Sequence, residues 1–144
     1  MNDESTAPIT HERVVGCTAD EAFAIYTGRI GEWWWPRNTA NAETLQAITI
    51  EPRVGGRVYA THSDIGEHDW GVVTVWEPGR RLVHTFTLAQ DQKHPSEVAV
   101  DFVPDGDAGS TMRFAHVGWT DANAQARAKF REWGPMLDRF AALA

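Results

Sequence analysis

The stretch VAVDFVPDGDAGSTMRFAHV, residues 98–117, decides the fold of this chain. Every second side chain in its two outer parts belongs to one mostly apolar face, formed by Val98, Val100, Phe102, Met112, Phe114 and His116. A period of two is typical of β-strands. Between the two parts, residues 104–110 are rich in Gly and Asp, which favours a hairpin loop. The sequence therefore predicts a β-hairpin whose apolar face must be covered by another element.

A helix that could cover this face is predicted after the hairpin. Apolar side chains recur there at spacings typical of a helix, at Ala126, Phe130, Trp133, Leu137, Phe140 and Ala144. Such a stripe indicates a helix that lays one face on a sheet. We expect Asp121 to be its N-cap. Because Pro135 has no backbone N–H, we also expect a kink or two abutting helical pieces at Gly134-Pro135.

Two short helices are predicted near the N-terminus. A first strand is expected over Ile9–Val15, followed by a helix from Ala19 to about Thr27. Thr18 and Glu21 have the spacing of a capping box at the start of that helix. A second helical turn, Arg29–Trp35, is expected to end at the proline that follows it.

The middle of the chain reads as strands separated by turns. Four strands are expected, over Thr44–Glu51, Arg57–Thr61, Trp70–Glu77 and Arg80–Leu88. Residues 62–69 read as a polar loop. The predicted class is therefore α+β, with seven strands in one curved antiparallel sheet that wraps around a long C-terminal helix. We expect a single domain over residues 9–144 and a disordered tail over residues 1–8.

Composition excludes several classes of protein. The chain has 144 residues, 42% of them hydrophobic, and a formal net charge of -7. This is the profile of an ordinary globular domain, and the negative charge argues against nucleic acid and anionic membrane surfaces as partners. No signal peptide or membrane span is visible, and the single cysteine, Cys17, excludes an intrachain disulfide. A cytoplasmic location is expected.

Tryptophan is unusually frequent. The seven residues are Trp33, Trp34, Trp35, Trp70, Trp76, Trp119 and Trp133. A small domain has little room to bury seven such large rings in a dry core, so some of them are expected to line a groove or cavity. Partial burial at the surface and at strand ends explains any one of them equally well.

Two histidines are the strongest candidates for a catalytic role. The strand period places His84, between Leu82 and Phe86, and His116 on the inward face, where an imidazole can transfer protons near neutral pH. Ordinary core histidines satisfied by carbonyl or hydroxyl groups are the favoured reading. Near the first helix, Cys17 could have a lowered thiol pKa, although a small residue in a turn is the simpler account.

One polar segment contains residue types that could bind a metal ion. It contains His62, Asp64, Glu67, His68 and Asp69, which are ligand types that fit zinc. Their spacing matches no recognised metal site, and a polar loop explains the same residues. We therefore expect no metal and no other cofactor.

Several short segments resemble one known superfamily. They are residues 18–23 (TADEAF), 31–34 (GEWW), 55–57 (GGR), 76–83 (WEPGRRLV) and 118–119 (GW). In this order and spacing they resemble the START-like, or SRPBCC, superfamily with its Bet-v-one-like helix-grip fold. The greatest similarity is to proteins that resemble the C-terminal domain of the activator of heat-shock protein 90 ATPase. The resemblance implies a pocket between sheet and C-terminal helix, with the second short helix at its entrance.

The resemblance leaves the function open. The superfamily includes lipid and hormone carriers, polyketide cyclases, a self-sacrificing resistance protein and chaperone activators. The separate N-terminal domain of the full activator is not expected in this chain, so a chaperone partner is not favoured. A homodimer is left open.

Our leading hypothesis is a protein that binds a small apolar or aromatic ligand. The expected ligand-binding residues are Trp33, Trp34, Trp70, His84, Phe86, Phe102, Phe114, His116, Phe130 and Trp133. The second hypothesis is a cyclase or hydrolase in which His84 or His116 acts as general acid or base beside Asp101 or Glu77. The outward face predicted for Asp101 counts against it. The third is a co-chaperone-like interaction module that uses its outer surface.

Overall fold

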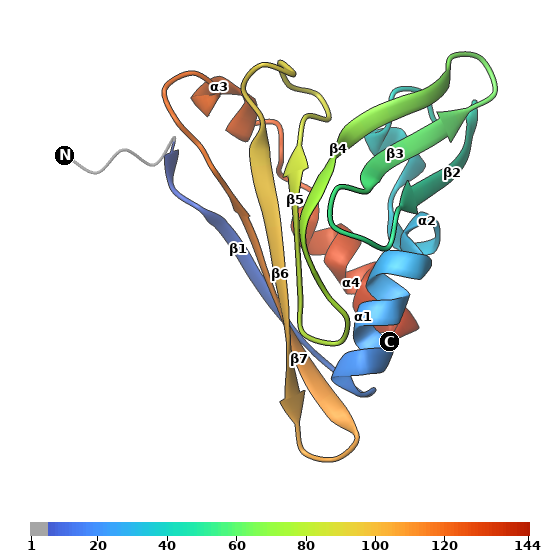
Figure 1. Cartoon of the computed structure of the whole chain (residues 1–144), viewed down its shortest axis with the longest axis vertical. Helices are drawn as coiled ribbons and strands as arrows, with labels where there is room; N and C mark the ends of the chain where they lie inside the picture. The colour runs from blue at the N-terminus through green and yellow to red at the C-terminus, as the bar shows by residue number, and fades with distance from the viewer. Residues whose placement is uncertain (1–5) are drawn as a thin grey trace.

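The structure, a computed structural model, describes residues 6–144. Across these residues seven strands form one antiparallel sheet in the order β1-β7-β6-β5-β4-β3-β2. The strands are β1 (Ile9–Val15), β2 (Leu45–Ile50), β3 (Arg57–His62), β4 (Gly66–Glu77), β5 (Arg81–Phe86), β6 (Ser96–Asp105) and β7 (Gly109–Val117). The helices are α1 (Ala19–Gly28), α2 (Ile30–Trp33), the 3-10 turn η2 (Pro36–Asn38), α3 (Ala124–Arg127) and α4 (Trp133–Leu143). In Figure 1 the sheet curls around α1 and α4, which confirms the predicted α+β class.

The predicted hairpin is β6 and β7. Val98 pairs with His116 and Phe102 with Met112, so the alternating side chains of both strands share one face. All four of these residues are buried. The concave face of the sheet, covered by α1 and α4, is therefore the core.

The first helix begins as its capping residues predict. The side-chain oxygen of Thr18 accepts a hydrogen bond of 3.2 Å from the backbone N–H of Glu21. The second helical turn is shorter than predicted, because α2 ends at Trp33. Pro36 does not simply end a helix but opens η2, since a proline is tolerated in a first helical turn.

The C-terminal helix is shorter and more broken than the sequence suggests. Asp121 does not cap it, and residues 128–132 separate α3 from α4. The interruption lies before Gly134-Pro135 rather than at it. Pro135 is the third residue of α4, where its missing N–H leaves no intrahelical bond unmade. Trp133, Leu137 and Phe140 still present the predicted buried stripe.

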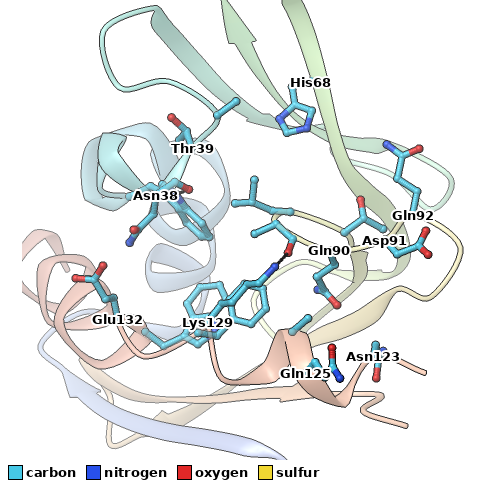
Figure 2. A pocket seen from close by; sticks show the side chains of 18 of the residues that line it. Asn38, Thr39, His68, Gln90, Asp91, Gln92, Asn123, Gln125, Lys129 and Glu132 are labelled. Atoms are coloured by element: carbon cyan, nitrogen blue, oxygen red, sulfur yellow. Dashed lines mark hydrogen bonds between the residues drawn. The ribbon is translucent and has the colours of Figure 1, made fainter. Parts of the chain in front are cut away.

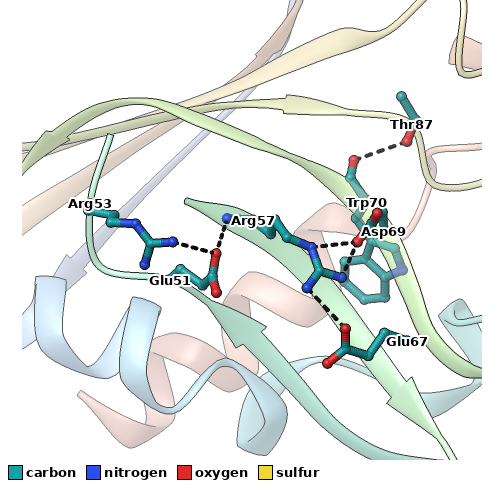
Figure 3. A network of polar contacts seen from close by, with 7 residues as sticks. All are labelled: Glu51, Arg53, Arg57, Glu67, Asp69, Trp70 and Thr87. Carbon is teal, nitrogen blue, oxygen red and sulfur yellow. Dashed lines mark hydrogen bonds and ion pairs between the residues drawn. The ribbon is translucent and has the colours of Figure 1, made fainter. Parts of the chain in front are cut away.

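Strand β4 begins four residues earlier than predicted, because residues 66–69 are strand rather than loop. The side chain of Arg57 on β3 binds the carboxylates of Glu67 and Asp69, as Figure 3 shows. The backbone N–H of Arg57 also donates to Glu51, over 2.7 Å. These ion pairs neutralise the acidic side chains on the outer face and allow a polar segment to extend the sheet.

Charged side chains also cross the outer face of the long strands. The guanidinium of Arg81 donates to both carboxylate oxygens of Asp101, over 2.7 and 2.8 Å. Asp101 pairs in register with Arg113, whose guanidinium lies 3.4 Å from the carboxylate of Glu12. Positively and negatively charged side chains therefore alternate across β5, β6, β7 and β1. Cross-strand pairs of opposite charge stabilise a sheet.

The core buries more of the seven tryptophans than the sequence analysis expects. Trp33, Trp34, Trp70, Trp119 and Trp133 are buried, and Trp35 and Trp76 are half-buried. The core accommodates them in a network of tilted and edge-to-face ring contacts. Trp34 and Trp70 are tilted with 4.9 Å between centroids, and Trp34 meets Trp133 edge to face at 5.2 Å.

The predicted tail begins outside the described residues, which exclude residues 1–5. Further along it, the carbonyl of Ala7 accepts a hydrogen bond of 2.7 Å from Arg127 Nε, next to the end of α3. No helix in the described part of the chain is long and apolar enough to cross a membrane.

Candidate functional site

A pocket of about 1010 Å³ lies beside the aromatic core rather than inside it. Three connections surround it, namely the segment 34–40 around η2, the segment 87–92 after β5, and the segment 122–136 from before α3 into α4. Figure 2 shows these connections facing one another, with His68 of β4 on a further side.

The floor of the pocket is aromatic and apolar. It consists of Trp34, Leu88, Phe130, Trp133 and Met136. Trp34 directly follows α2, and its indole N–H donates to the carbonyl of Asn38 over 3.1 Å, which fixes the ring. Trp133 starts α4 and lies nearly parallel to Phe130, with 6.5 Å between ring centroids.

Four charged side chains line the pocket, Arg37, Asp91, Lys129 and Glu132, and all are engaged within the protein. Asp91 accepts a hydrogen bond of 2.9 Å from the backbone N–H of Lys93. Arg37 of η2 forms an ion pair with Glu132, just before α4. The ammonium of Lys129 donates to the carbonyl of Ala89 over 2.9 Å, and Figure 2 shows this bond within the pocket. Ala89 has a φ of 60°, an uncommon conformation for a residue other than glycine. Most of the other polar groups that line the pocket are uncharged.

Neutral polar side chains make up much of the wall. They are Asn38, Thr39, Thr87, Gln90, Gln92, Asn123 and Gln125, and the imidazole of His68 lies on a further side of the pocket. Together with the aromatic floor, they suit an uncharged ligand that has both a flat apolar body and polar edges. Asn123 has a structural role in addition, because its amide group bonds to the backbone at Thr120, His94 and Gly118.

The structure divides the predicted ligand-binding residues into two groups. Trp34, Phe130 and Trp133 line the pocket. The other seven, which are Trp33, Trp70, His84, Phe86, Phe102, Phe114 and His116, are buried in the core outside the pocket lining. Sequence reasoning missed the polar wall, because its residues come from connections with no periodic pattern.

His116 is held on both sides of its ring. The indole N–H of Trp133 donates to His116 Nδ1 over 3.1 Å. Because an indole N–H only donates, Nδ1 carries no proton, and the proton on Nε2 is donated to Ser96 Oγ over 2.6 Å. Burial is the main cause that lowers the pKa of His116 to about 3, and the charges of His84 and Arg127 contribute. The ring is therefore neutral, with no free nitrogen to exchange protons with a ligand.

His84 is buried with the opposite arrangement. Its Nδ1 lies 2.7 Å from the carbonyl of Thr85, which can only accept, so Nδ1 carries the proton. Burial lowers the pKa of His84 to about 4. Both histidines thus have the bonding of core residues.

The acids paired with these histidines in the enzyme hypothesis lie elsewhere. Asp101 is bound to Arg81 on the outer face of the sheet. Glu77 lies 3.6 Å from the guanidinium of Arg80 in the β4–β5 turn, also away from the pocket lining. Neither carboxylate is placed to assist an inward histidine.

The residues considered from the sequence as metal ligands do not come together in the structure. Glu67 and Asp69 bind Arg57 on the outer face, whereas His62 is buried and His68 lines the pocket. In the described part of the chain, no three potential ligands converge on a common metal position. The pKa of Cys17 is raised by burial and by the charge of Glu21, opposite to the lowering considered from the sequence.

Comparisons with known proteins identify relatives of the whole chain. A sequence model described as "Activator of Hsp90 ATPase homolog 1-like protein" matches residues 17–144. No curated protein matches the chain. Among solved structures, an anthrahydroquino-gamma-pyrone synthase, Txn09, complexed with SUM is 28% identical with a TM-score of 0.68, over 99% of this chain and 100% of the synthase chain.

Two further structures resemble the fold at lower identity. Protein MLL2253 from Mesorhizobium loti is 20% identical with a TM-score of 0.71, over 95% of this chain and 96% of its own. The Aha1 dimer from Colwellia psychrerythraea, solved in solution, is 14% identical with a TM-score of 0.67, over 94% of this chain and 93% of its own. At such identities the likeness is one of fold.

Proposed function

The chain belongs to the family of Activator of Hsp90 ATPase homolog 1-like proteins, and on that premise we propose that it binds a small, largely aromatic molecule. The ligand lies in the pocket between η2, the segment after β5 and the start of α4. One observation carries the proposal. A space of about 1010 Å³ opens onto a floor of Trp34, Phe130 and Trp133, and this is large enough for a compound of several rings.

The charges and burial of the pocket support an uncharged ligand. Arg37 and Glu132 neutralise each other at the rim, and Lys129 is bound to a backbone carbonyl. An anionic ligand would have to displace one of these interactions to gain a cation of its own. A neutral, planar molecule can instead stack on the floor without breaking any of them.

An enzyme of the cyclase type is the second candidate. It is favoured by the similarity to the synthase Txn09, which extends over both chains from end to end. Proton transfer by His84 or His116 is not supported, because both are buried and hydrogen-bonded within the core. Any catalysis would instead use the polar groups that line the pocket.

The binding proposal is tested by filling the pocket. Ala126 lines the pocket and is half-buried, so Ala126→Trp places a large ring in the space. The matched control is Ala128→Trp, on an exposed residue outside the pocket lining. The neutral fluorescent probe N-phenyl-1-naphthylamine should bind the wild type and the control alike. We expect Ala126→Trp to weaken its binding about tenfold or more, with an unchanged unfolding midpoint.

Equal probe binding by all three proteins would contradict this location, and no binding by the wild type would contradict the function. Native mass spectrometry of the purified protein would add the mass of any retained ligand. Sedimentation of the same sample would decide whether the chain forms a homodimer, as its Colwellia psychrerythraea neighbour does. A cytoplasmic location remains part of the proposal and is supported by the single cysteine.

A further inference from the structure

Lys129 is a cation of the pocket lining whose charge is not paired with a carboxylate. Among residues 6–144 it takes part in no ion pair, whereas Arg37, the other cation in the lining, is paired with Glu132. Lys129 is exposed, so part of its side chain is open to solvent. The sequence contains one other lysine, Lys93, which lies outside the pocket lining. The charge of Lys129 is therefore available to a ligand.

The ammonium of Lys129 lies between two walls of the pocket. The side chain starts on the segment 122–136, and its Nζ donates over 2.9 Å to the carbonyl of Ala89, on the segment 87–92. Both residues are exposed and both line the pocket, and Figure 2 shows the bond inside it. Because both ends of this bond belong to the lining, the ammonium itself borders the cavity.

The ammonium also keeps hydrogen-bonding capacity for a ligand. A lysine ammonium has three N–H donors and no acceptor. The bond to Ala89 is the one hydrogen bond that the side chain of Lys129 makes to residues 6–144, so two of its donors have no protein partner. A ligand oxygen can accept from one of them while the bond to Ala89 stays in place.

The carbonyl that holds the ammonium is presented by an uncommon backbone conformation. Among residues 6–144, Ala89 is the one residue other than glycine with a positive φ, of 60°. The next residue fixes this turn, because the backbone N–H of Gln90 donates to the carbonyl of Thr87 and its side chain donates to the carbonyl of Phe86, each over 3.0 Å. Conformations of this kind are costly and cluster at functional sites, where the surrounding structure holds them. The strained residue and the available cation thus meet at one point of the pocket.

The aromatic floor is close to this point. Lys129 directly precedes Phe130 and stands four residues before Trp133, and both rings belong to the floor. A planar molecule that stacks on the floor turns its edge toward the walls, between which the ammonium lies. A polar atom at the edge of such a molecule is therefore the part that meets Lys129.

The charges of the lining favour a neutral acceptor over an anion at this place. The two cations, Arg37 and Lys129, are matched by two anions, Asp91 and Glu132. A carboxylate bound to Lys129 would add a negative charge to this balanced set, next to the carbonyl oxygen of Ala89. A ketone oxygen accepts the same hydrogen bond without the added charge, whereas a hydrocarbon would cover the two donors and leave them without a partner.

We propose that Lys129 determines the specificity of the pocket, because its ammonium, held by Ala89, donates a second hydrogen bond to a ketone oxygen at the edge of a planar aromatic ligand. This inference rests on the proposed function and specifies its ligand class. Neutral aromatic ketones are the preferred ligands, ahead of hydrocarbons of the same shape and of aromatic carboxylates.

The test compares two rigid, planar compounds of nearly the same shape, 9-fluorenone and fluorene. They differ at one carbon, which is a ketone in the first and a CH₂ group in the second. Their affinities for the purified protein are measured by equilibrium dialysis, and the ratio of the two affinities is compared between variants. Lys129→Met keeps an apolar side chain but removes the ammonium. We expect it to lower the affinity for 9-fluorenone relative to fluorene about tenfold.

The ratio separates a ligand contact from a structural role. If Lys129 only held the segment around Ala89 in place, Lys129→Met would weaken both compounds equally, and the unchanged ratio would overturn the inference. Lys93→Met, on the exposed lysine outside the lining, is the control and should keep the wild-type ratio. Tighter binding of 9-fluorenone-4-carboxylate than of 9-fluorenone to the wild type would also overturn the inference, because Lys129 would then be an anion site.

N-phenyl-1-naphthylamine separates a failure of this inference from a failure of the proposed function. If the probe binds the wild type but Lys129→Met leaves the ratio unchanged, the ligand class is wrong and the proposed function stands. If neither the probe nor 9-fluorenone nor fluorene binds the wild type, both fail.

Discussion

At the scale of single residues, His84 and His116 form a contrasting pair. Both are inward and neutral, yet the carbonyl of Thr85 requires a proton on Nδ1 of His84, and the indole of Trp133 requires its absence from Nδ1 of His116. We predict opposite tautomers, Nδ1–H for His84 and Nε2–H for His116. Long-range nitrogen–proton correlation spectra of the two imidazoles measure this directly. The same tautomer in both rings would contradict the hydrogen bonding described above.

The pKa values of these residues also predict how stability depends on pH. The pKa of His84 is about 4 in the folded protein, below the ordinary value of 6.5. As the pH falls below about 6.5, the unfolded chain is protonated at this residue first, so the free energy of unfolding decreases until the folded form is protonated as well. Between pH 7.5 and pH 4.5, His84 should account for a loss of about 2 kcal/mol.

Urea denaturation at these two pH values measures the effect. The variant His84→Gln cannot titrate and should lose about 2 kcal/mol less than the wild type over the same interval. His94→Gln, on an exposed histidine, is the control and should follow the wild type. Equal losses in the wild type and His84→Gln would show that His84 is not the buried, neutral group described here.

At the scale of secondary-structure elements, Gly71 allows β4 and β5 to approach each other. A Cβ atom at this position would lie 1.8 Å from the carbonyl oxygen of Thr85 on β5. Gly71→Ala must therefore push the two strands apart, and we expect it to destabilise the protein by about 3 kcal/mol. Gly16→Ala is the control, because a Cβ atom there meets nothing within 4 Å and should change stability by less than about 0.5 kcal/mol. Equal urea midpoints for the two variants would disprove the close approach.

The elements also show where sequence patterns are reliable. The period of two on β6 and β7 reports burial directly, so the inward positions of Val98, Phe114 and His116 were predictable. The break between α3 and α4 was not, because the apolar spacing from Ala126 to Trp133 suits a continuous helix. Residues in the break make contacts distant in sequence that the helical spacing does not report, such as the bond from Lys129 to the carbonyl of Ala89.

The candidate site was less predictable than the fold, for a related reason. Large aromatic residues can be recognised from the sequence alone as candidates for ligand contact. Trp34, Phe130 and Trp133 were expected to bind a ligand on this basis. Gln90 and the other polar residues of the pocket wall carry no such signal, because they lie on connections that have no periodic pattern.

At the scale of the whole molecule, the sheet joins the first strand of the chain to its last strand. Strand β1 pairs along its whole length with β7, so Ile9 lies opposite His116. Contacts so distant in sequence must form after long loops have closed, which slows folding. We predict refolding in about milliseconds to seconds, measured by stopped-flow tryptophan fluorescence after dilution from urea. Refolding complete within microseconds would contradict a rate set by this pairing.

The placement of the pocket has a consequence for how this fold can diversify. Its walls come from three connections, whereas the rings beneath α1 and α4 are fixed by the strands and by one another. Exchanges at exposed positions such as Gln92 or Gln125 can therefore change the shape and polarity of the pocket without disturbing the interior. In evolution and in protein design, the pocket wall can therefore be changed by substitution while the core, and with it the fold, is preserved.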